Sequence, residues 1–93
     1  MSASRKLEEM YRRYRENLSQ ALSGLKLQAA GEEASRVREI VELAESYRRD
    51  AEHFQNTGRP VTALISLAYG EGLLDALRLL RLVHFTWKRS GAG

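Results

Sequence analysis

An acidic residue that the sequence places among apolar neighbours is the first candidate for chemistry. On a helical wheel, Asp75 falls inside the apolar arc, with Leu64 and Leu82 on one side and Ala68 on the other. A carboxylate there must be paired or hydrogen-bonded, because burying a lone charge is costly. We expect Asp75 either to bond a tyrosine hydroxyl or an arginine and fix helix register, or to line a polar pocket. The residues of that candidate pocket are Tyr47, Asp50, Tyr69 and Asp75.

One aspartate–histidine pair has the spacing of two metal ligands. Asp50 and His53 are three residues apart on one helix face. A helical di-iron site needs a Glu-x-x-His motif on each of two helices and two further carboxylates, and this chain has one approximate copy. No Ser-His-Asp arrangement or pair of carboxylates is legible either. We therefore expect no catalytic residue, no metal and no cofactor.

A second histidine supports an enzymatic alternative. Arg78 and His84 are separated by five residues, a spacing that resembles the Arg-x(4–6)-His motif of the helical HEPN ribonuclease superfamily. The resemblance implies that Arg78 would hold phosphate and that His84 would move a proton. Leu79 stands where those enzymes usually have a polar residue, and the chain is short for that fold.

The basic residues are divided between the two ends of the chain. Fifteen Lys and Arg stand against 12 Asp and Glu, a formal charge of +3. Residues 1–15 carry five basic and two acidic side chains, and residues 76–93 carry four basic and no acidic ones. The acidic middle favours ion pairs between neighbouring helices, and the alternative is a surface that binds phosphate. The candidate phosphate contacts are Arg12, Arg13, Arg15, Lys88 and Arg89.

Three helical segments must position these residues. Apolar residues recur at intervals of three and four in each segment, and breakers separate the segments at residues 24–31 and 56–60. The sequence predicts helices over residues 3–28, 32–56 and 60–88. No run is seen to alternate with period two, so no strands are expected. Because short connections make neighbouring helices antiparallel, the predicted fold is all-α, an antiparallel up-down-up three-helix bundle in one domain over residues 1–93.

The third segment carries two apolar lines. We expect the broader line, which runs from Val61 through Ile65 and Gly72 to Leu79, to face the core. The narrower line lies opposite and is flanked by arginines, as is typical of a protein contact. The alternative is a central third helix, buried on most of its circumference. The candidate partner surface comprises Leu67, Leu74, Arg78, Arg81 and Phe85.

Two glycines lie inside this same segment. Glycine costs about 1 kcal/mol relative to alanine in a helix, so something should offset each of them. We expect a neighbouring helix to approach closely at Gly72. Gly70 falls on the polar side of the wheel, where it would mark a kink or the footprint of a partner.

A resemblance to a known family begins at residue 47. Residues 47–54 read Tyr-Arg-Arg-Asp-Ala-Glu-His-Phe, a Gly-Arg-Pro turn follows at 58–60, and residues 68–76 read Ala-Tyr-Gly-Glu-Gly-Leu-Leu-Asp-Ala. This pattern resembles domain of unknown function 357, a small archaeal family. The resemblance implies a short cytoplasmic three-helix protein and supplies no activity. It places on signature positions Asp50, Tyr69, Gly70, Gly72 and Asp75.

Size and architecture favour a non-enzymatic protein-interaction or adaptor module. We expect self-association or a protein partner, and no small-molecule substrate. No signal peptide and no apolar run of membrane length is legible, so we expect a cytoplasmic location and no membrane span. The first alternative is a protein that binds RNA or DNA with its basic termini, and the second is the ribonuclease. Residues 77–89 also fit a basic, aromatic helix lying on a membrane surface, against which core packing is favoured.

Overall fold

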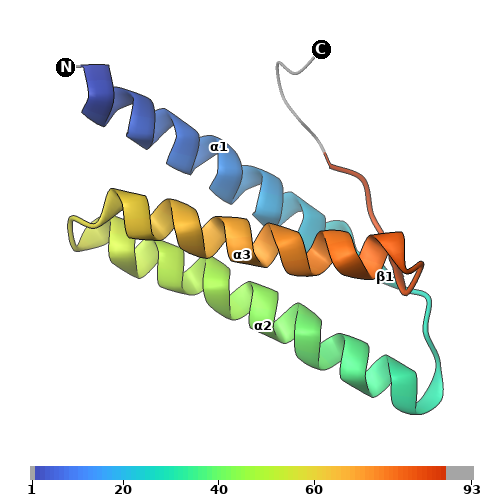
Figure 1. The fold of residues 1–93 in the computed structure, drawn as a ribbon. Helices are drawn as coiled ribbons and strands as arrows, with labels where there is room; N and C mark the ends of the chain where they lie inside the picture. The colour runs from blue at the N-terminus through green and yellow to red at the C-terminus, as the bar shows by residue number, and fades with distance from the viewer. Residues whose placement is uncertain (1, 88–93) are drawn as a thin grey trace.

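The computed structural model describes residues 2–87. Over these residues the chain forms three helices and one two-stranded antiparallel sheet. The helices run up, down and up (Figure 1), which confirms the predicted all-α three-helix fold. The elements in chain order are α1 (Ser2–Gly24), β1 (Lys26–Leu27), α2 (Gly31–Asn56), α3 (Pro60–Leu79) and β2 (Val83–His84).

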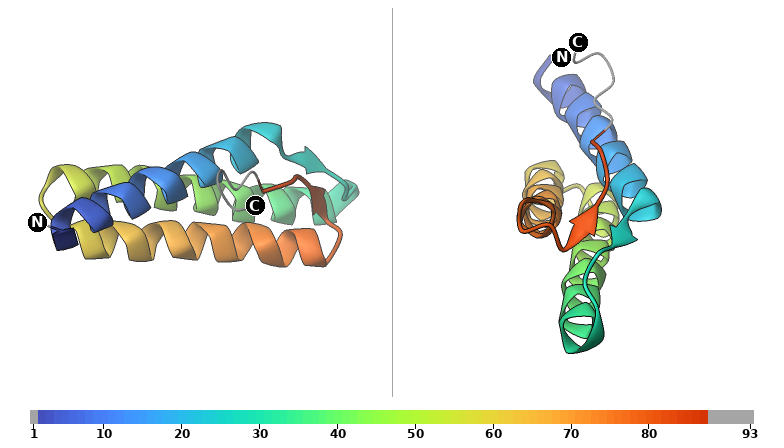
Figure 2. Two further views of the ribbon diagram at one scale, coloured as in Figure 1. Left: turned by 90° about the horizontal axis from the view of Figure 1, so that it is seen from above. Right: turned by 90° about the vertical axis from the view of Figure 1, so that its right-hand side faces the viewer.

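The hairpin of α2 and α3 forms the frame of the fold. Past the end of α2, the Thr57 hydroxyl donates a 2.9 Å hydrogen bond to the carbonyl oxygen of His53. Gly58 then adopts φ 80°, a left-handed conformation that costs glycine nothing, and Pro60 starts α3, where no N–H is needed. The two helices lie side by side, and α1 crosses them with most of its contacts on α3 (Figure 2).

The core lies between one face of α3 and the other two helices. Leu67 and Leu74 of α3 are fully buried, as is Leu18 of α1. Ser66 is buried too, and its hydroxyl donates a 2.8 Å hydrogen bond to the carbonyl oxygen of Tyr47 on α2. The buried residues of this core are Leu18, Ala21, Val37, Ala44, Ala51, Ala63, Leu67, Leu74, Leu77, Val83 and Phe85.

The face of α3 that packs inward is opposite to the predicted one. Val61, Ile65 and Leu79, which the sequence placed in the core, are 57%, 52% and 72% exposed. The narrower line through Leu67 and Leu74 is the buried one instead. The phase was wrong because both lines are apolar, so hydrophobic periodicity alone does not say which of them meets α1 and α2.

The roles of the two glycines are exchanged as well. A Cβ atom on Gly70 would lie 2.9 Å from Leu18 Cδ2 and 3.3 Å from the carbonyl oxygen of Ala44. Gly70 is therefore buried at the closest approach of the three helices, not on a polar side. Gly72 is exposed, and a Cβ there would meet nothing within 4 Å. The predicted close approach at Gly72 within this chain was wrong.

The third helix ends well before the predicted residue 88. It stops at Leu79, and Arg81 adopts φ 62°, a left-handed conformation that is uncommon for a residue with a side chain. The chain thereby turns back, and β2 pairs with β1 in the register Lys26↔His84 and Leu27↔Val83. The first helix likewise ends at Gly24, short of the predicted 28.

The short sheet follows an alternation that the periodicity analysis overlooked. In Leu-Lys-Leu-Gln over residues 25–28 the apolar side chains are half-buried and the polar ones exposed. Residues 83–87, Val-His-Phe-Thr-Trp, alternate in the same way. Such alternation is the signature of a half-buried strand, so the expectation that no run has period two was wrong.

Candidate interaction surface

Three stripes of different chemistry run along α3. The inner stripe is the buried face described above, which includes Leu67 and Gly70. A polar stripe follows the spacing i, i+4, i+7 and consists of Glu71, Asp75 and Arg78, the charged residues of α3. The third stripe, which we call the outer face, points away from α1 and α2 and consists of Val61, Ile65, Ala68, Gly72, Ala76 and Leu79.

The outer face is exposed and carries no charge. Each of its six residues is exposed to solvent, and its centre consists of small residues flanked by large ones. At the edge beside α2, the exposed side chains of Tyr69 and Leu80 widen it. Tyr69 stacks on Tyr47 of α2 with 5.5 Å between ring centroids, and Leu43 lies one turn from Tyr47, 46% exposed. The apolar surface thus continues from α3 onto α2.

The predicted polar pocket is only half assembled. Tyr47 and Tyr69 do come together, as the stacked pair just described. Asp50 is exposed on α2, and Asp75 lies on the polar stripe, six residues from Tyr69 and with different partners. The four residues therefore do not form one pocket, because the helix rotation that exposes the outer face turns Asp75 away from the tyrosines.

Asp75 instead holds the end of the described chain in place. Its Oδ1 accepts a 2.8 Å hydrogen bond from Trp87 Nε1 and a 3.2 Å bond from the Arg78 guanidinium. Phe85 packs edge-on against Trp87 with 4.8 Å between ring centroids, and the Arg78 guanidinium lies 6.0 Å over the Phe85 ring. We call this group the clasp: Asp75, Arg78, Phe85 and Trp87. Of the two roles expected for Asp75, the structure bears out the bond to an arginine.

The predicted partner surface is used inside the molecule. Leu67 and Leu74 are core residues, and Phe85 is 5% exposed. Arg78 belongs to the clasp, and Arg81 is exposed in the turn that follows α3. The assignment was wrong because it assumed a helix through Phe85, whereas the chain turns back and brings Phe85 onto the core.

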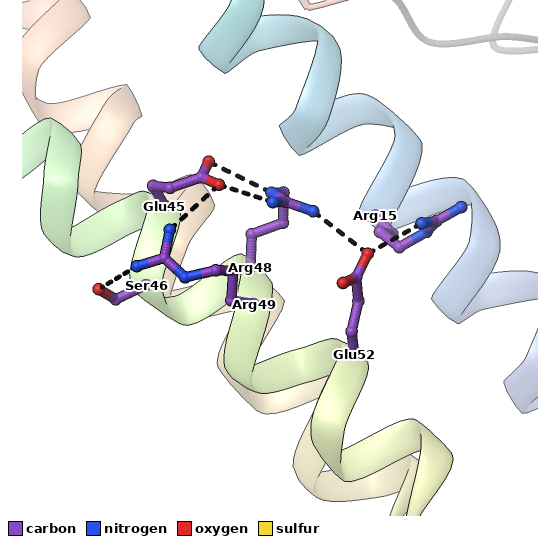
Figure 3. A network of polar contacts seen from close by, with 6 residues as sticks. All are labelled: Arg15, Glu45, Ser46, Arg48, Arg49 and Glu52. Carbon is purple, nitrogen blue, oxygen red and sulfur yellow. Dashed lines mark hydrogen bonds and ion pairs between the residues drawn. The ribbon is translucent and has the colours of Figure 1, made fainter.

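A network of ion pairs links α1 to α2 (Figure 3). Arg15 reaches Glu52 at 3.0 Å, which confirms the expected pairing between helices for this arginine. Arg48 joins Glu52 at 3.2 Å and Glu45 at 2.6 Å, and Arg49 adds a 3.4 Å contact to Glu45. The hydrogen bond from Arg48 holds the pKa of the Glu45 carboxyl below its ordinary value and raises the pKa of Arg48.

The other candidate phosphate contacts are distributed unevenly. Arg12 and Arg13 are exposed on α1, where they line a shallow surface hollow together with Glu9 and Glu16. Since acidic and basic side chains share this hollow, its charges offset one another. Lys88 and Arg89 lie outside the described residues.

The residues of the enzymatic and metal alternatives do not converge. Arg78 lies near the end of α3 and His84 on β2, so the turn after α3 separates them and they are not on one helix. His84 is exposed on β2 and lines a hollow of about 430 Å³ with residues of α1 and β1. His53 packs beside Phe54 at 5.8 Å between rings. Among residues 2–87, no three His, Asp or Glu side chains gather as metal ligands would.

The membrane-surface alternative required a helix over residues 77–89. That helix stops at Leu79, and the residues that follow include a strand. Within the described part of the chain, no helix combines the length and the apolarity needed to cross a bilayer.

The outer face and the clasp are the features that the sequence interpretation missed. The row of the outer face was recognised but assigned to the core. Two signals could have corrected this assignment. Ser66 and Gly70 mark the inner face, because a serine hydroxyl and a glycine within a helix are both explained by a close neighbouring helix. Tyr69, whose hydroxyl favours contact with solvent, lies outside that face. The alternation of residues 83–87 could have revealed the clasp.

Comparison with known proteins identifies the family. The family model described as protein of unknown function DUF357 matches residues 13–83, which include the second half of α1, all of α2 and α3, and the start of β2. Phe85 and Trp87 of the clasp lie beyond the matched range. No curated protein and no solved structure matches the chain significantly. The chain belongs to the family of proteins of unknown function designated DUF357.

Proposed function

We propose that this protein is a non-enzymatic protein-interaction module and that the outer face of α3 is its contact surface. The observation that carries the proposal is the exposure of Val61, Ile65 and Leu79 along a helix face without a charged residue. Contiguous exposed apolar surface of this kind is typical of protein contact sites.

The composition of α3 supports the same conclusion. A surface helix normally has one apolar face and one charged face, whereas a helix that is apolar on most of its circumference is usually buried. In α3 the charged residues are confined to the polar stripe, which lies between the inner and the outer faces. The outer face thus has the composition of a buried surface while lying in solvent.

The nucleic-acid alternative has weaker support. A phosphate-binding surface needs a concentration of unpaired basic side chains. Arg15 is paired with Glu52, and Arg12 and Arg13 are interleaved with acidic residues.

Site-specific photo-crosslinking in cells that naturally make the protein tests the proposal. We would place a photoreactive amino acid at Ile65 on the outer face and, as a matched control, at Arg13, which is also exposed but lies on the charged surface of α1. We expect crosslinked protein adducts from position 65 and few from position 13. Equal yields at the two positions, or none at position 65, would contradict the proposal.

A further inference from the structure

We infer that the partner of the outer face is a second copy of this chain, bound antiparallel with the two-fold axis at Gly72. This inference rests on the proposed function and names the partner of that surface. Two identical chains related by a two-fold axis must present the same patch to each other, so the patch must be complementary to itself. Four features of α3 meet this requirement.

The first feature is the order of residues along the outer face. Ala68 and Ala76 lie four residues before and after Gly72, and Ile65 and Leu79 lie seven residues before and after it. An antiparallel copy centred on Gly72 therefore sets Ile65 against Leu79 of its partner and Ala68 against Ala76 of its partner. Large residues meet large ones and small residues meet small ones from Ile65 to Leu79.

The second feature is the space above the centre. Gly72 lacks a side chain, and a Cβ there would meet nothing within 4 Å in its own chain. Gly inside a helix lowers the equilibrium constant for helix formation about fivefold relative to Ala, and packing within this chain does not offset that loss. A second helix that crosses at Gly72 would use the missing side chain for close contact between backbones.

The third feature is the difference between the two edges of the outer face. The edge beside α2 carries Tyr69 and Leu80, and the opposite edge is the polar stripe with Glu71 and Asp75. In an antiparallel two-fold pair, each edge meets the same edge of the partner, so the apolar edges join. In a parallel pair each apolar edge would meet a polar stripe. Antiparallel pairing also sets the helix dipoles in opposite directions, which is favourable.

The fourth feature is the available area. Together with Tyr69, Leu80 and Leu43, the outer face presents six large side chains that are 46% to 72% exposed, and a standard interface buries about 800 Å² per partner. The outer face itself carries no charge that would select an oppositely charged partner. The polar stripes of the two copies meet along the opposite edge, where Arg78 pairs with Asp75 within each chain. A self-complementary apolar patch of this size fits a reversible dimer.

Disulfide trapping tests both the partner and its orientation, because the chain contains no cysteine. Single variants Gly72→Cys, Ala68→Cys and Ala76→Cys introduce thiols only at exposed positions, and Arg13→Cys serves as the control on α1. Under mild oxidation we expect Gly72→Cys to form a covalent dimer faster than Arg13→Cys, because the two-fold axis brings its two thiols together even though each added side chain weakens the non-covalent contact. We expect Ala68→Cys and Ala76→Cys to crosslink when mixed with each other and not when oxidised alone.

Other results overturn the inference in recognisable ways. A parallel dimer would crosslink Ala68→Cys and Ala76→Cys each with itself. A monomer would crosslink Gly72→Cys no faster than Arg13→Cys, and sedimentation of the unmodified chain would show one species at all concentrations. If the purified chain is monomeric while position 65 crosslinks to a different protein in cells, the second-copy inference fails and the proposed function stands. If neither experiment gives adducts, both fail.

A charge substitution gives an independent measure of the same contact. Ile65→Glu places a carboxylate on the outer face, where it is solvated in the monomer and unpaired in the dimer. We expect the dissociation constant to rise at least a hundredfold, measured by sedimentation equilibrium, with unchanged helical circular dichroism. Glu16→Gln changes an exposed residue of α1, serves as the control, and should leave the dissociation constant unchanged. An unchanged constant for Ile65→Glu would overturn the inference.

Discussion

The inner and outer faces of α3 have similar residues and opposite surroundings. Both contain a row of large apolar residues, and both contain a glycine, Gly70 on the inner face and Gly72 on the outer. A Cβ on the inner glycine would collide with Leu18 and crowd the Ala44 carbonyl, whereas a Cβ on the outer glycine would meet nothing within 4 Å. The difference shows that hydrophobicity marks surfaces suited to burial, while fit to the neighbouring helices selects which of them the chain buries itself.

Truncation of one leucine on each face should give the largest contrast. Leu74→Ala removes a fully buried side chain and should lower the free energy of unfolding by about 2–5 kcal/mol. Leu79→Ala removes a side chain that is mostly exposed and should change it by less than about 0.5 kcal/mol at concentrations where the chain is monomeric. Urea unfolding measures both. Similar losses for the two variants would break the distinction between the faces.

Alanine substitutions at the two glycines should shift stability in opposite directions. Gly72→Ala should stabilise the monomer by about 1 kcal/mol, because alanine favours the helix and its Cβ meets no atom of the chain. Gly70→Ala gains the same propensity but forces a Cβ to 2.9 Å from Leu18, a buried side chain with little room to move. Overpacking costs about 1–3 kcal/mol, so we expect a net loss.

Thermal unfolding of dilute protein compares the two glycine variants under conditions where no dimer contributes. A gain of stability for Gly70→Ala would show that the inner face is loosely packed and that the two glycines do not differ in kind in how closely they are packed. At high concentration, Gly72→Ala should lose its advantage, because the added methyl group separates the paired outer faces.

Removal of the Asp75 carboxylate tests the polar stripe that divides the two faces. Asp75→Ala leaves the Trp87 indole and the Arg78 guanidinium without this acceptor and should destabilise by about 1 kcal/mol, since the carboxylate is partly exposed. Trp87 is the single tryptophan, so its fluorescence reports the clasp directly and should shift to the red. Asp50→Ala changes an exposed aspartate on α2, is the matched control, and should leave the Trp87 emission maximum unchanged. An unchanged emission maximum would contradict the clasp.

Acid should weaken the ion pairs that Glu45 makes with Arg48 and Arg49 along α2, while leaving the contact of α1 with the inner face of α3 intact. The folded pKa of Glu45 is depressed, mainly by the hydrogen bond from Arg48, so its contribution to stability is complete above the ordinary pKa of 4.5 and is lost as the pH falls through the folded value. These pairs are partly exposed, so the loss should stay below about 1 kcal/mol. Unfolding measured between pH 7 and pH 3 should show a smaller decrease for Glu45→Gln than for the wild type. Identical pH profiles would mean that the Glu45 pairs contribute nothing to stability.

Much of the fold followed from local pattern because helix formation depends on local spacing and on breakers. The limits of α2 and the start of α3 were predicted within a residue, since Gly31, Gly58 and Pro60 act through backbone conformation alone. The end of α3 was not predicted, because Leu79, Leu80 and Leu82 continue the apolar pattern past the point where the chain turns back. The left-handed turn at Arg81 and the pairing of β2 with β1 draw the chain away from the helix.

The sequence by itself determined three amphipathic or apolar helices, their order, and two uncommon positions at Gly70 and Asp75. The tertiary structure decided which apolar face of α3 is buried and what Asp75 bonds. Burial of either face would give a similar hydrophobic free energy, so the hydrophobic effect alone does not decide which face is buried. The choice depends on close packing of Gly70 against Leu18 and on the hydrogen bond from Ser66 to Tyr47, and these contacts exist only after the helices have come together.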